Sequence, residues 1–451
     1  MRRRDFIKLS IVTGSAILMP SYSYAATLDV NKIDFSSATY ENNAAQTIII
    51  FMYGGASQLS GNITNLEEID KYSQNSHAKY FRGTTSTANG CWQEAGGAHM
   101  EDLIAAGDMT LYRTCYSQER ENADNKAHSV CTEQNQRGTY DIDGGGIVAN
   151  IASILQAKGI VNNKTLMPFV TMEGESTFYT EGNIALPGYL KPVGINENFD
   201  NPYDRDISRW LYCTRDESKN NSCSNKDSGY TPKLSKDMDI LAQSNNQKGK
   251  VKDAFASREK FSKFIENIKS STTPDLGDSA YPNNNFSEKI EAAIKVLDKN
   301  PDTKMITLDT GGLGGWDDHN DGRNYVGRME NLFQSLKSAM AHLKVIQKDT
   351  SINIMVFGEF GRNVNLNSAN GWDHGNLQNL YVLGGKNYFT HKGIVGETVV
   401  DPSGSNRIWL KPKRGTYWFE PLSIAATLYH IYGIENPNIL TGGNYPPINI
   451  V

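Results

Sequence analysis

The sequence is poor in cysteine and has no large surplus of charge of either sign, and both features limit the kinds of protein it can be. Its 451 residues include 45 basic and 50 acidic side chains, a formal net charge of -5. These charges are mixed along the chain, so no basic surface of the kind that binds nucleic acid is expected. After residue 25, no segment approaches the roughly 18 consecutive apolar residues that a membrane helix needs. We therefore expect neither a nucleic-acid partner nor a membrane span in the mature protein.

The five cysteines exclude a cysteine zinc site and limit disulfide formation. They are Cys91, Cys115, Cys131, Cys213 and Cys223. None stands in a C-x-x-C pair, the spacing typical of structural zinc sites. At most two disulfides can form, with one thiol left over. Cys213 and Cys223 bracket the polar segment TRDESKNNS, and in an oxidising compartment we expect them to close it as a stapled loop.

The first 25 residues carry an export signal. The pattern R-R-x-F-[LI]-K of twin-arginine signals matches residues 3–8, an apolar stretch covers 11–19, and small residues at 23–25 suit a signal peptidase. An amphipathic first helix is the alternative interpretation. The signal predicts a periplasmic protein that the twin-arginine export machinery carries in its folded state, a route that often serves proteins with a bound metal or cofactor.

The rest of the chain alternates apolar runs with helical patterns. Near-continuous apolar runs suit strands that are buried on both faces, and strands that alternate with helices form a mostly parallel sheet. The strands are expected at 46–55, 109–117, 166–174, 304–312, 352–361 and 380–385, and the helices at 145–159, 286–300, 327–347 and 421–433. The fold class predicted is α/β, a three-layer α/β/α sandwich.

One region interrupts this alternation. Residues 175–285 are rich in Asn, Ser, Lys and Asp and have few apolar runs. We interpret them as a polar insertion or cap between two parts of one α/β domain, 26–174 and 286–451. A disordered linker is the alternative, because so polar a composition buries little apolar surface.

Metal-ligand side chains gather beside three of the predicted strands, after two of them and before the third. GGWDDHND follows the strand at 304–312, FGEFGR ends the strand at 352–361, and GWDHGN precedes the strand at 380–385. Loops at the carboxyl ends of parallel strands meet at one edge of a sheet. Carboxylate oxygens and imidazole nitrogens are ligands for Zn, Mn or Fe, and carboxylates alone suit Ca or Mg. The alternative is that these side chains only cap turns in the loops. The candidates are Asp317, Asp318, His319, Glu359, Asp373 and His374.

These motifs resemble those of the DUF1501 family, whose patterns are roughly GGWDTH, SEFGR and NGRDHW. FMYGGASQL at 51–59 also looks like the LFLxGGxSxxD segment of that family. The family is similar to the alkaline phosphatase and sulfatase superfamily, which implies an alkaline-phosphatase-like fold and divalent metal ions, Zn or Mn first and Ca or Mg as alternatives. The ligands that the resemblance implies are Asp317, His319, Glu359, Asp373 and His374, with Asp309 and Asp318 as secondary candidates.

The nucleophile is expected in NKAHSVCTEQNQRG, which resembles the helix start that carries the nucleophile in sulfatases. Ser129 is the candidate nucleophile, because a hydroxyl at a helix N-terminus gains backbone N–H groups that stabilise an anion. His128 beside it is a candidate ligand or proton donor. An ordinary helix cap is the alternative for Ser129. Arg362 of FGEFGR is expected to bind an ester oxygen, with a surface ion pair as its alternative.

One departure from the family pattern affects the predicted function. Where the family has an acidic residue after GGxSxx, this chain has Ser60. The prediction is a periplasmic metal-dependent hydrolase or transferase acting on small or polymeric phosphate or sulfate esters. The missing carboxylate supports an alternative, a non-catalytic envelope protein that retains the fold for binding or assembly.

Overall fold

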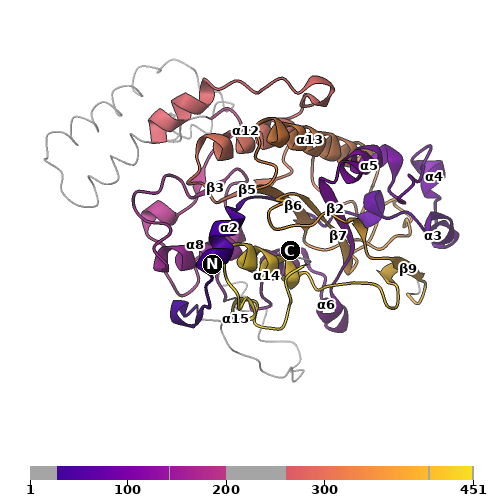
Figure 1. Ribbon diagram of the computed structural model, residues 1–451. Helices are drawn as coiled ribbons and strands as arrows, with labels where there is room; N and C mark the ends of the chain where they lie inside the picture. The colour runs from indigo at the N-terminus through magenta and orange to yellow at the C-terminus, as the bar shows by residue number, and fades with distance from the viewer. Residues whose placement is uncertain (1–27, 142, 200–260, 405–406, 449–451) are drawn as a thin grey trace, which may run out of the picture.

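The computed structural model describes residues 28–141, 143–199, 261–404 and 407–448. These residues form one large sheet with helices on both faces (Figure 1). The predicted export signal and the Cys213–Cys223 loop lie outside the described residues.

The sheet has eight strands in the order β4-β3-β5-β1-β6-β7-β2-β8. Its strands are β1 (Gln46–Met52), β2 (Met109–Tyr116), β3 (Phe169–Thr171), β4 (Val193–Gly194), β5 (Met305–Asp309), β6 (Ile352–Gly358), β7 (Leu377–Gly384) and β8 (Gly393–Val395). The neighbours β4, β3, β5, β1 and β6 pair in parallel, and β8 is parallel to β2. The predicted α/β sandwich with a mostly parallel sheet is therefore confirmed.

Strand β7 is the exception, because it pairs antiparallel with both β6 and β2. Its reversed direction places its first residue, Leu377, at the sheet edge where the parallel strand β6 ends. The segment GWDHGN, which immediately precedes β7, therefore lies at the same edge as the loops that follow β5 and β6.

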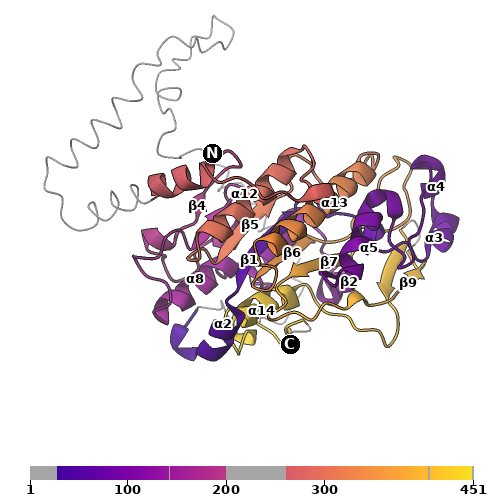
Figure 2. The same ribbon diagram turned by 45° about the horizontal axis from the view of Figure 1, so that its top comes forward.

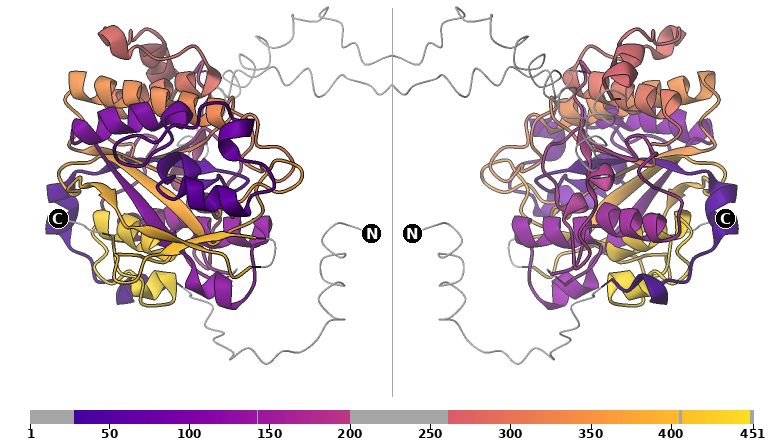
Figure 3. Two further views of the ribbon diagram at one scale, coloured as in Figure 1. Left: turned by 90° about the vertical axis from the view of Figure 1, so that its right-hand side faces the viewer. Right: turned by 90° about the vertical axis from the view of Figure 1, so that its left-hand side faces the viewer.

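Helices cover both faces of the sheet, and Figures 2 and 3 show the three layers from different sides. One face carries α5 (Ala98–Ala105), α12 (Asn285–Lys299) and α13 (Tyr325–Val345); the other carries α7 (His128–Arg137), α8 (Ile147–Ala157) and α14 (Leu422–Ile431). Side chains of β1 alternate between the two cores. Ile48 and Ile50 join the core under α12 and α13, whereas Ile49 and Phe51 join the core under α8 and α14. This alternation is the two-residue period of a strand buried on both faces.

The four predicted helices are present, with ends that differ from the prediction by about two residues. Local capping explains two of the helix ends near the site. The side chain of Asn284 accepts a hydrogen bond from the Ser287 backbone N–H at the start of α12, and α7 ends where Gly138 adopts a left-handed conformation with φ 69°.

Several short elements lack a clear periodic pattern in the sequence and were not predicted. They are α2 (Ser37–Asn43), α3 (Leu66–Tyr72), α4 (His77–Tyr80), α5, α6 (Gln118–Asn122), α15 (Asn438–Thr441), the strands β4 and β8, the hairpin of β9 (Thr398–Asp401) and β10 (Trp409–Pro412), the 3-10 turns Val30–Lys32, Gln58–Gly61, Thr177–Tyr179, Gly188–Leu190 and Gly277–Ser279, and a π turn at Gln93–Gly97. Most are a single turn or a few residues long, too short for a hydrophobic period to be recognised.

The predicted polar insertion is described only at its two ends. At the N-terminal end of the insertion, β4 pairs with β3 and extends the sheet by one strand. At its C-terminal end, residues 261–269 are helical, and Phe261, Phe264 and Ile265 are buried in the core under α12 and α13. Both described ends of residues 175–285 therefore pack on the α/β domain.

The described cysteines and helices bear on the expectations about disulfides and membrane spans. Cys91, Cys115 and Cys131 are buried free thiols, so the described cysteines form no disulfide, and burial raises the pKa of each thiol. Within the described ranges, none of the helices combines the length and the apolar character needed to cross a membrane.

Phe51 offers a test of the packing between sheet and helices. Its ring is fully buried and lies edge-on to those of Phe178, at 5.8 Å, and Phe357, at 5.5 Å. We expect Phe51→Ala to lower the free energy of unfolding by about 3–5 kcal/mol, because it leaves a cavity. Tyr72→Ala, at a side chain that is 43% exposed, should change it by less than about 0.5 kcal/mol. Urea denaturation measures both, and equal effects would contradict the assigned core.

Candidate metal centre

Three loops and one helix start converge at the carboxyl edge of the sheet. The Gly54-Gly55 turn follows β1, GGWDDHND follows β5, and the segment from Glu359 to GWDHGN connects β6 to β7. The first turn of α7 begins at His128. Polar side chains that are far apart in the sequence therefore reach one place, as the strand-end argument predicts.

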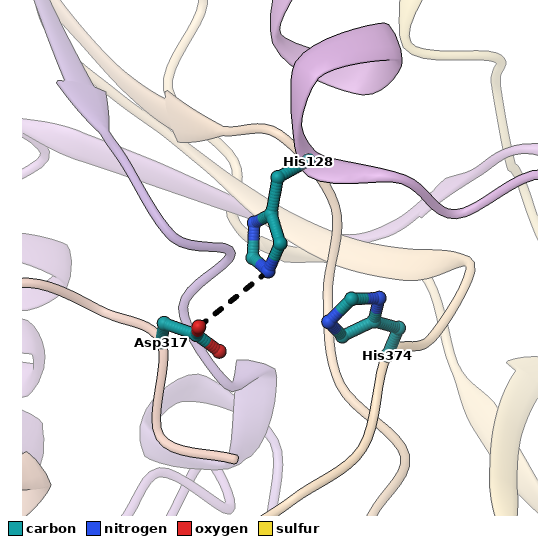
Figure 4. A group of neighbouring side chains, drawn as sticks. All are labelled: His128, Asp317 and His374. Carbon is teal, nitrogen blue, oxygen red and sulfur yellow. Dashed lines mark ion pairs between the residues drawn. The ribbon is translucent and has the colours of Figure 1, made fainter. Parts of the chain in front are cut away.

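His128, Asp317 and His374 form a cluster of potential metal ligands (Figure 4). One ligand atom from each lies within 4.8 Å of the other two. His128 Nε2 is 3.6 Å from Asp317 Oδ2, and the two imidazole rings lie edge-to-face with their centroids 4.6 Å apart. The cluster is accessible, because the side chains of His128 and Asp317 are 36% and 55% exposed.

Both imidazoles are oriented from behind by oxygen acceptors. His128 Nδ1 lies 2.6 Å from Glu359 Oε2, and His374 Nδ1 lies 2.7 Å from the backbone oxygen of Lys126. A carbonyl oxygen can only accept a hydrogen bond, so Nδ1 of His374 carries the proton and Nε2 is its other ring nitrogen. Nδ1 of His128 likewise faces an acceptor, Glu359 Oε2, which leaves Nε2 turned toward Asp317. This is the arrangement that holds a histidine in position to bind a metal ion.

The protonation states of His374 and Asp317 also suit cation binding. Burial and the positive charge of Arg362 lower the pKa of His374 to about 4, so its imidazole is neutral at pH 7. Partial burial works to raise the pKa of Asp317, but the hydrogen bond and the positive charge of Arg362, with smaller effects of His128 and His374, outweigh it. The net effect lowers the Asp317 pKa, which keeps the carboxylate ionised.

Arg362 is buried beneath the cluster and binds all the converging loops. Its side chain is inaccessible to solvent, and Nη2 donates to Asp317 Oδ1 at 2.7 Å. Nε donates to the Gly55 carbonyl at 2.7 Å, Nη1 to the Trp372 carbonyl at 3.0 Å, and Nη2 also contacts the Gly54 and Trp316 carbonyls. These donors are committed to the protein, so the structure places Arg362 as the residue that positions Asp317.

The two Gly-Trp-Asp motifs anchor their loops in the same way. Trp316 and Trp372 are fully buried, and their indole N–H groups donate to Thr310 Oγ1 at 2.7 Å and to His77 Nε2 at 3.1 Å. Each motif thus buries its tryptophan while the following residue, Asp317 or Asp373, reaches the sheet edge.

The loops also approach each other too closely for a side chain. A Cβ on Gly371 would lie 2.3 Å from the backbone oxygens of Asp318 and His319, and a Cβ on Gly54, whose φ is +104°, would lie 2.5 Å from the Asp317 nitrogen. Glycine is required at both positions.

Two of the predicted ligands form a pair beside the cluster. His319 Nε2 lies 3.0 Å from Asp373 Oδ1, and the His319 and His374 ring centroids are 5.7 Å apart. The predicted ligand Glu359 lies behind His128, since its Oε1 accepts the Gly54 N–H at 2.7 Å and its Oε2 accepts from His128. Both of its carboxylate oxygens are therefore used in positioning other groups.

The secondary candidates face other partners. Asp318 is buried and pairs with Arg328 of α13, and burial raises its pKa. Asp309 pairs with Lys289 of α12 at 2.7 Å.

The proposed nucleophile and the position of the missing carboxylate lie in contrasting environments. Ser129 is exposed at the second position of α7 and hydrogen-bonds to none of the described side chains. Ser60 is fully buried, with its hydroxyl 3.2 Å from Tyr381 Oη and its N–H bonded to Tyr325 Oη. Ser60 stands where the family has an acidic residue, and it is not a member of the His128–Asp317–His374 cluster.

The donor set fits a divalent ion. Bonds of about 2.1 Å hold the ligands of such an ion about 3–4 Å apart, so atoms already within 4.8 Å of one another need only small side-chain movements. Two imidazoles and one carboxylate are the ligands of several catalytic metal sites and leave coordination positions open for water or substrate.

Sequence reasoning missed two features of this centre. The acceptor for His374 is the backbone carbonyl of Lys126, which no side-chain pattern reveals. Arg407, whose Nε lies 3.1 Å from Asp373 Oδ2, lies in a segment without any motif. The contact between Arg407 and Asp373 is visible only in the folded structure, since 34 residues separate them in the sequence.

An α/β sandwich with a two-histidine, one-aspartate cluster at its strand ends defines a candidate metalloprotein. The chain belongs to the DUF1501 family, described as "Protein of unknown function (DUF1501)", whose model matches residues 44–401. A search of curated protein sequences found no match.

Distant similarity links the structure to several solved proteins. Alkaline phosphatase from the Antarctic bacterium TAB5 has 14% identity and a TM-score of 0.35, covering 86% of this chain and 98% of that one. The lipoteichoic acid synthase LtaP from Listeria monocytogenes has 9% identity and a TM-score of 0.33, covering 92% and 79%. Ps i-CgsB in complex with k-i-k-neocarrahexaose has 10% identity and a TM-score of 0.39, covering 89% and 75%. At such scores the activity must be argued from the site itself.

The depressed pKa of His374 predicts a pH-dependent stability of the metal-free protein. Between pH 6.5 and about 4 the unfolded chain binds a proton at His374 that the folded protein does not. The His374 contribution to stability is therefore complete above pH 6.5 and is lost as the pH falls toward 4. We expect the urea midpoint to fall more between pH 7 and pH 5 in the native protein than in His374→Gln. An equal fall in both would contradict the assigned environment of His374.

Proposed function

We propose that this DUF1501 protein is an exported metal-dependent hydrolase or transferase that acts on phosphate or sulfate esters. The observation that carries the proposal is the His128–Asp317–His374 cluster, in which both imidazoles are held with Nε2 available. The twin-arginine pattern at residues 3–8 supports delivery to the periplasm by the twin-arginine machinery.

The residues of the cluster have distinct roles in this proposal. His128, Asp317 and His374 hold the ion, Glu359 orients His128, and Arg362 orients Asp317. A divalent ion bound there would polarise an ester oxygen and lower the pKa of a bound water. The ion is Zn or Mn by its nitrogen and oxygen ligands, with Ca or Mg as less suitable alternatives.

The choice of a phosphate or sulfate ester rests on the start of α7. His128 is the first residue of this ten-residue helix, so the unbonded backbone N–H groups of its first turn lie beside the cluster. Such groups and the helix dipole favour a tetrahedral oxyanion. The resemblance of the motifs to the alkaline phosphatase and sulfatase superfamily points to the same substrates.

Metal analysis of the mature protein, purified without chelators, tests the ligand assignment. We expect about one equivalent of divalent metal in the native protein and its loss in His128→Ala, Asp317→Ala and His374→Ala, because each removes one of three ligands. His319→Ala is the matched control, since His319 is paired with Asp373, and it should keep this equivalent. A second equivalent that disappears in His319→Ala would instead make His319 and Asp373 ligands of a second ion.

Activity assays of the same native and variant proteins distinguish an enzyme from a non-catalytic binding protein. With Zn or Mn added, the native protein should hydrolyse an aryl phosphate or an aryl sulfate, whereas Asp317→Ala should not. A native protein that binds metal but turns over neither ester would favour the alternative, a non-catalytic envelope protein.

Ser129 is the proposed nucleophile, because its exposed hydroxyl directly follows His128 at the start of α7. If the hydroxyl attacks the ester, Ser129→Ala should lower kcat by about 1,000-fold or more while metal content stays unchanged. Thr132→Ala, in the same helix, is the control and should retain activity. Full activity in Ser129→Ala would assign the attack to water.

A further inference from the structure

Arg407 lies beside the candidate metal centre with donors that no described residue uses. It precedes β10, and its Nε lies 3.1 Å from Asp373 Oδ2. The side chain is 52% exposed. Within the described parts of the chain, its two terminal amino groups hydrogen-bond to no residue. The outer edge of the guanidinium, which carries those groups, therefore remains available to a ligand.

The position of Arg407 is fixed from two directions. The following residue, Ile408, is buried, and its N–H donates to Asn365 Oδ1 at 2.7 Å. Its carbonyl accepts the Val364 N–H at 2.8 Å. The backbone at Arg407 is therefore attached to the segment that follows Arg362, while Asp373 holds the guanidinium. A side chain anchored at both ends loses little freedom when it binds a ligand.

The contact with Asp373 connects Arg407 to the metal centre. Oδ2 of Asp373 accepts from Arg407, whereas Oδ1 lies 3.0 Å from His319 Nε2. His374, a member of the cluster, is the next residue in the chain. In space, Arg407 connects to the cluster through Asp373 and then His319, whose ring centroid is 5.7 Å from that of His374.

The other cations around the centre are already engaged. Arg362 is buried and binds four backbone carbonyls and Asp317. Lys126 is only 13% exposed, pairs with Asp124 at 3.1 Å and lies 5.3 Å from the centre of the Trp409 ring. Of these three cations, Arg407 alone combines exposure with donors that no described residue uses.

We propose that Arg407 binds the anionic group of the substrate next to the metal ion. A guanidinium presents parallel N–H groups that match two oxygens of a phosphate or sulfate group. The inference rests on the proposed function for the identity of this group, and it assigns a substrate-binding role that the sequence motifs do not indicate. The metal ligands would face one part of the ester, and Arg407 would bind its remaining oxygens.

Binding of inorganic phosphate and of inorganic sulfate to the zinc-loaded mature protein tests the inference by calorimetry. We expect Arg407→Gln to weaken binding of one or both anions about 10- to 100-fold, because a charged hydrogen-bonding pair is lost. Gln retains a donor for Asp373, and zinc content should stay at the native value. Arg414→Ala is the matched control, since Arg414 is exposed on the segment after β10, and it should bind like the native protein.

Two results would overturn the inference. One is equal anion affinity in the native, Arg407→Gln and Arg414→Ala proteins, and the other is no anion binding by the native protein. Failure of the proposed function gives a different pattern: anion binding that depends on Arg407 without turnover of aryl phosphate or aryl sulfate would leave the inference standing. For an active enzyme, Arg407→Gln should in addition raise KM or lower kcat for the ester, whereas Arg407→Lys should restore part of the loss.

Discussion

One buried guanidinium, that of Arg362, determines how the loops at the sheet edge are arranged. It donates to carbonyls of the turn after β1 and of both Gly-Trp-Asp loops, and it pairs with Asp317. A buried cation must be paired and hydrogen-bonded, because its desolvation is otherwise very unfavourable. The carbonyls supply that compensation only when all the loops are in place. The arrangement of the loops and the position of Asp317 therefore depend on each other.

The near-repetition of the Gly-Trp-Asp motif follows from this constraint. Each loop needs an apolar anchor that stays in the core, and Trp316 and Trp372 provide it with their indole N–H groups satisfied. Each loop also needs a carbonyl directed at Arg362 and a carboxylate at the rim. Gly371 permits the close backbone contact between the loops. The motif is thus a packing unit that presents an aspartate, and its occurrence twice reflects two loops meeting around one arginine.

The sequence predicted the sheet and the convergence of the polar motifs at one of its edges, but not the contacts that each side chain makes there. Strands and long helices have periodic apolar patterns, and the polar motifs beside the strands lie together at the edge where the parallel strands end. The motifs give residue types but not the direction of each atom. Glu359 and His128 were both candidates, and only the fold shows that Glu359 supports His128 through Nδ1. Arg407 and the Lys126 carbonyl were missed because their contacts join segments that share no local pattern.

The charges around the cluster would link metal binding to the binding of an anionic ester. Among the acidic and guanidinium side chains there, Asp317, Glu359 and Asp373 outnumber Arg362 and Arg407 by one, while Lys126 and Asp124 pair with each other. Imidazoles bind metal in their neutral form, so a divalent ion held by His128 and His374 would supply positive charge that the two rings then do not carry. A divalent cation would add two positive charges, and in this partly buried setting their effect would be weakly screened. Under the proposed function, metal loading and anion affinity are therefore expected to be coupled, with the ion attracting the anionic group and Arg407 orienting it.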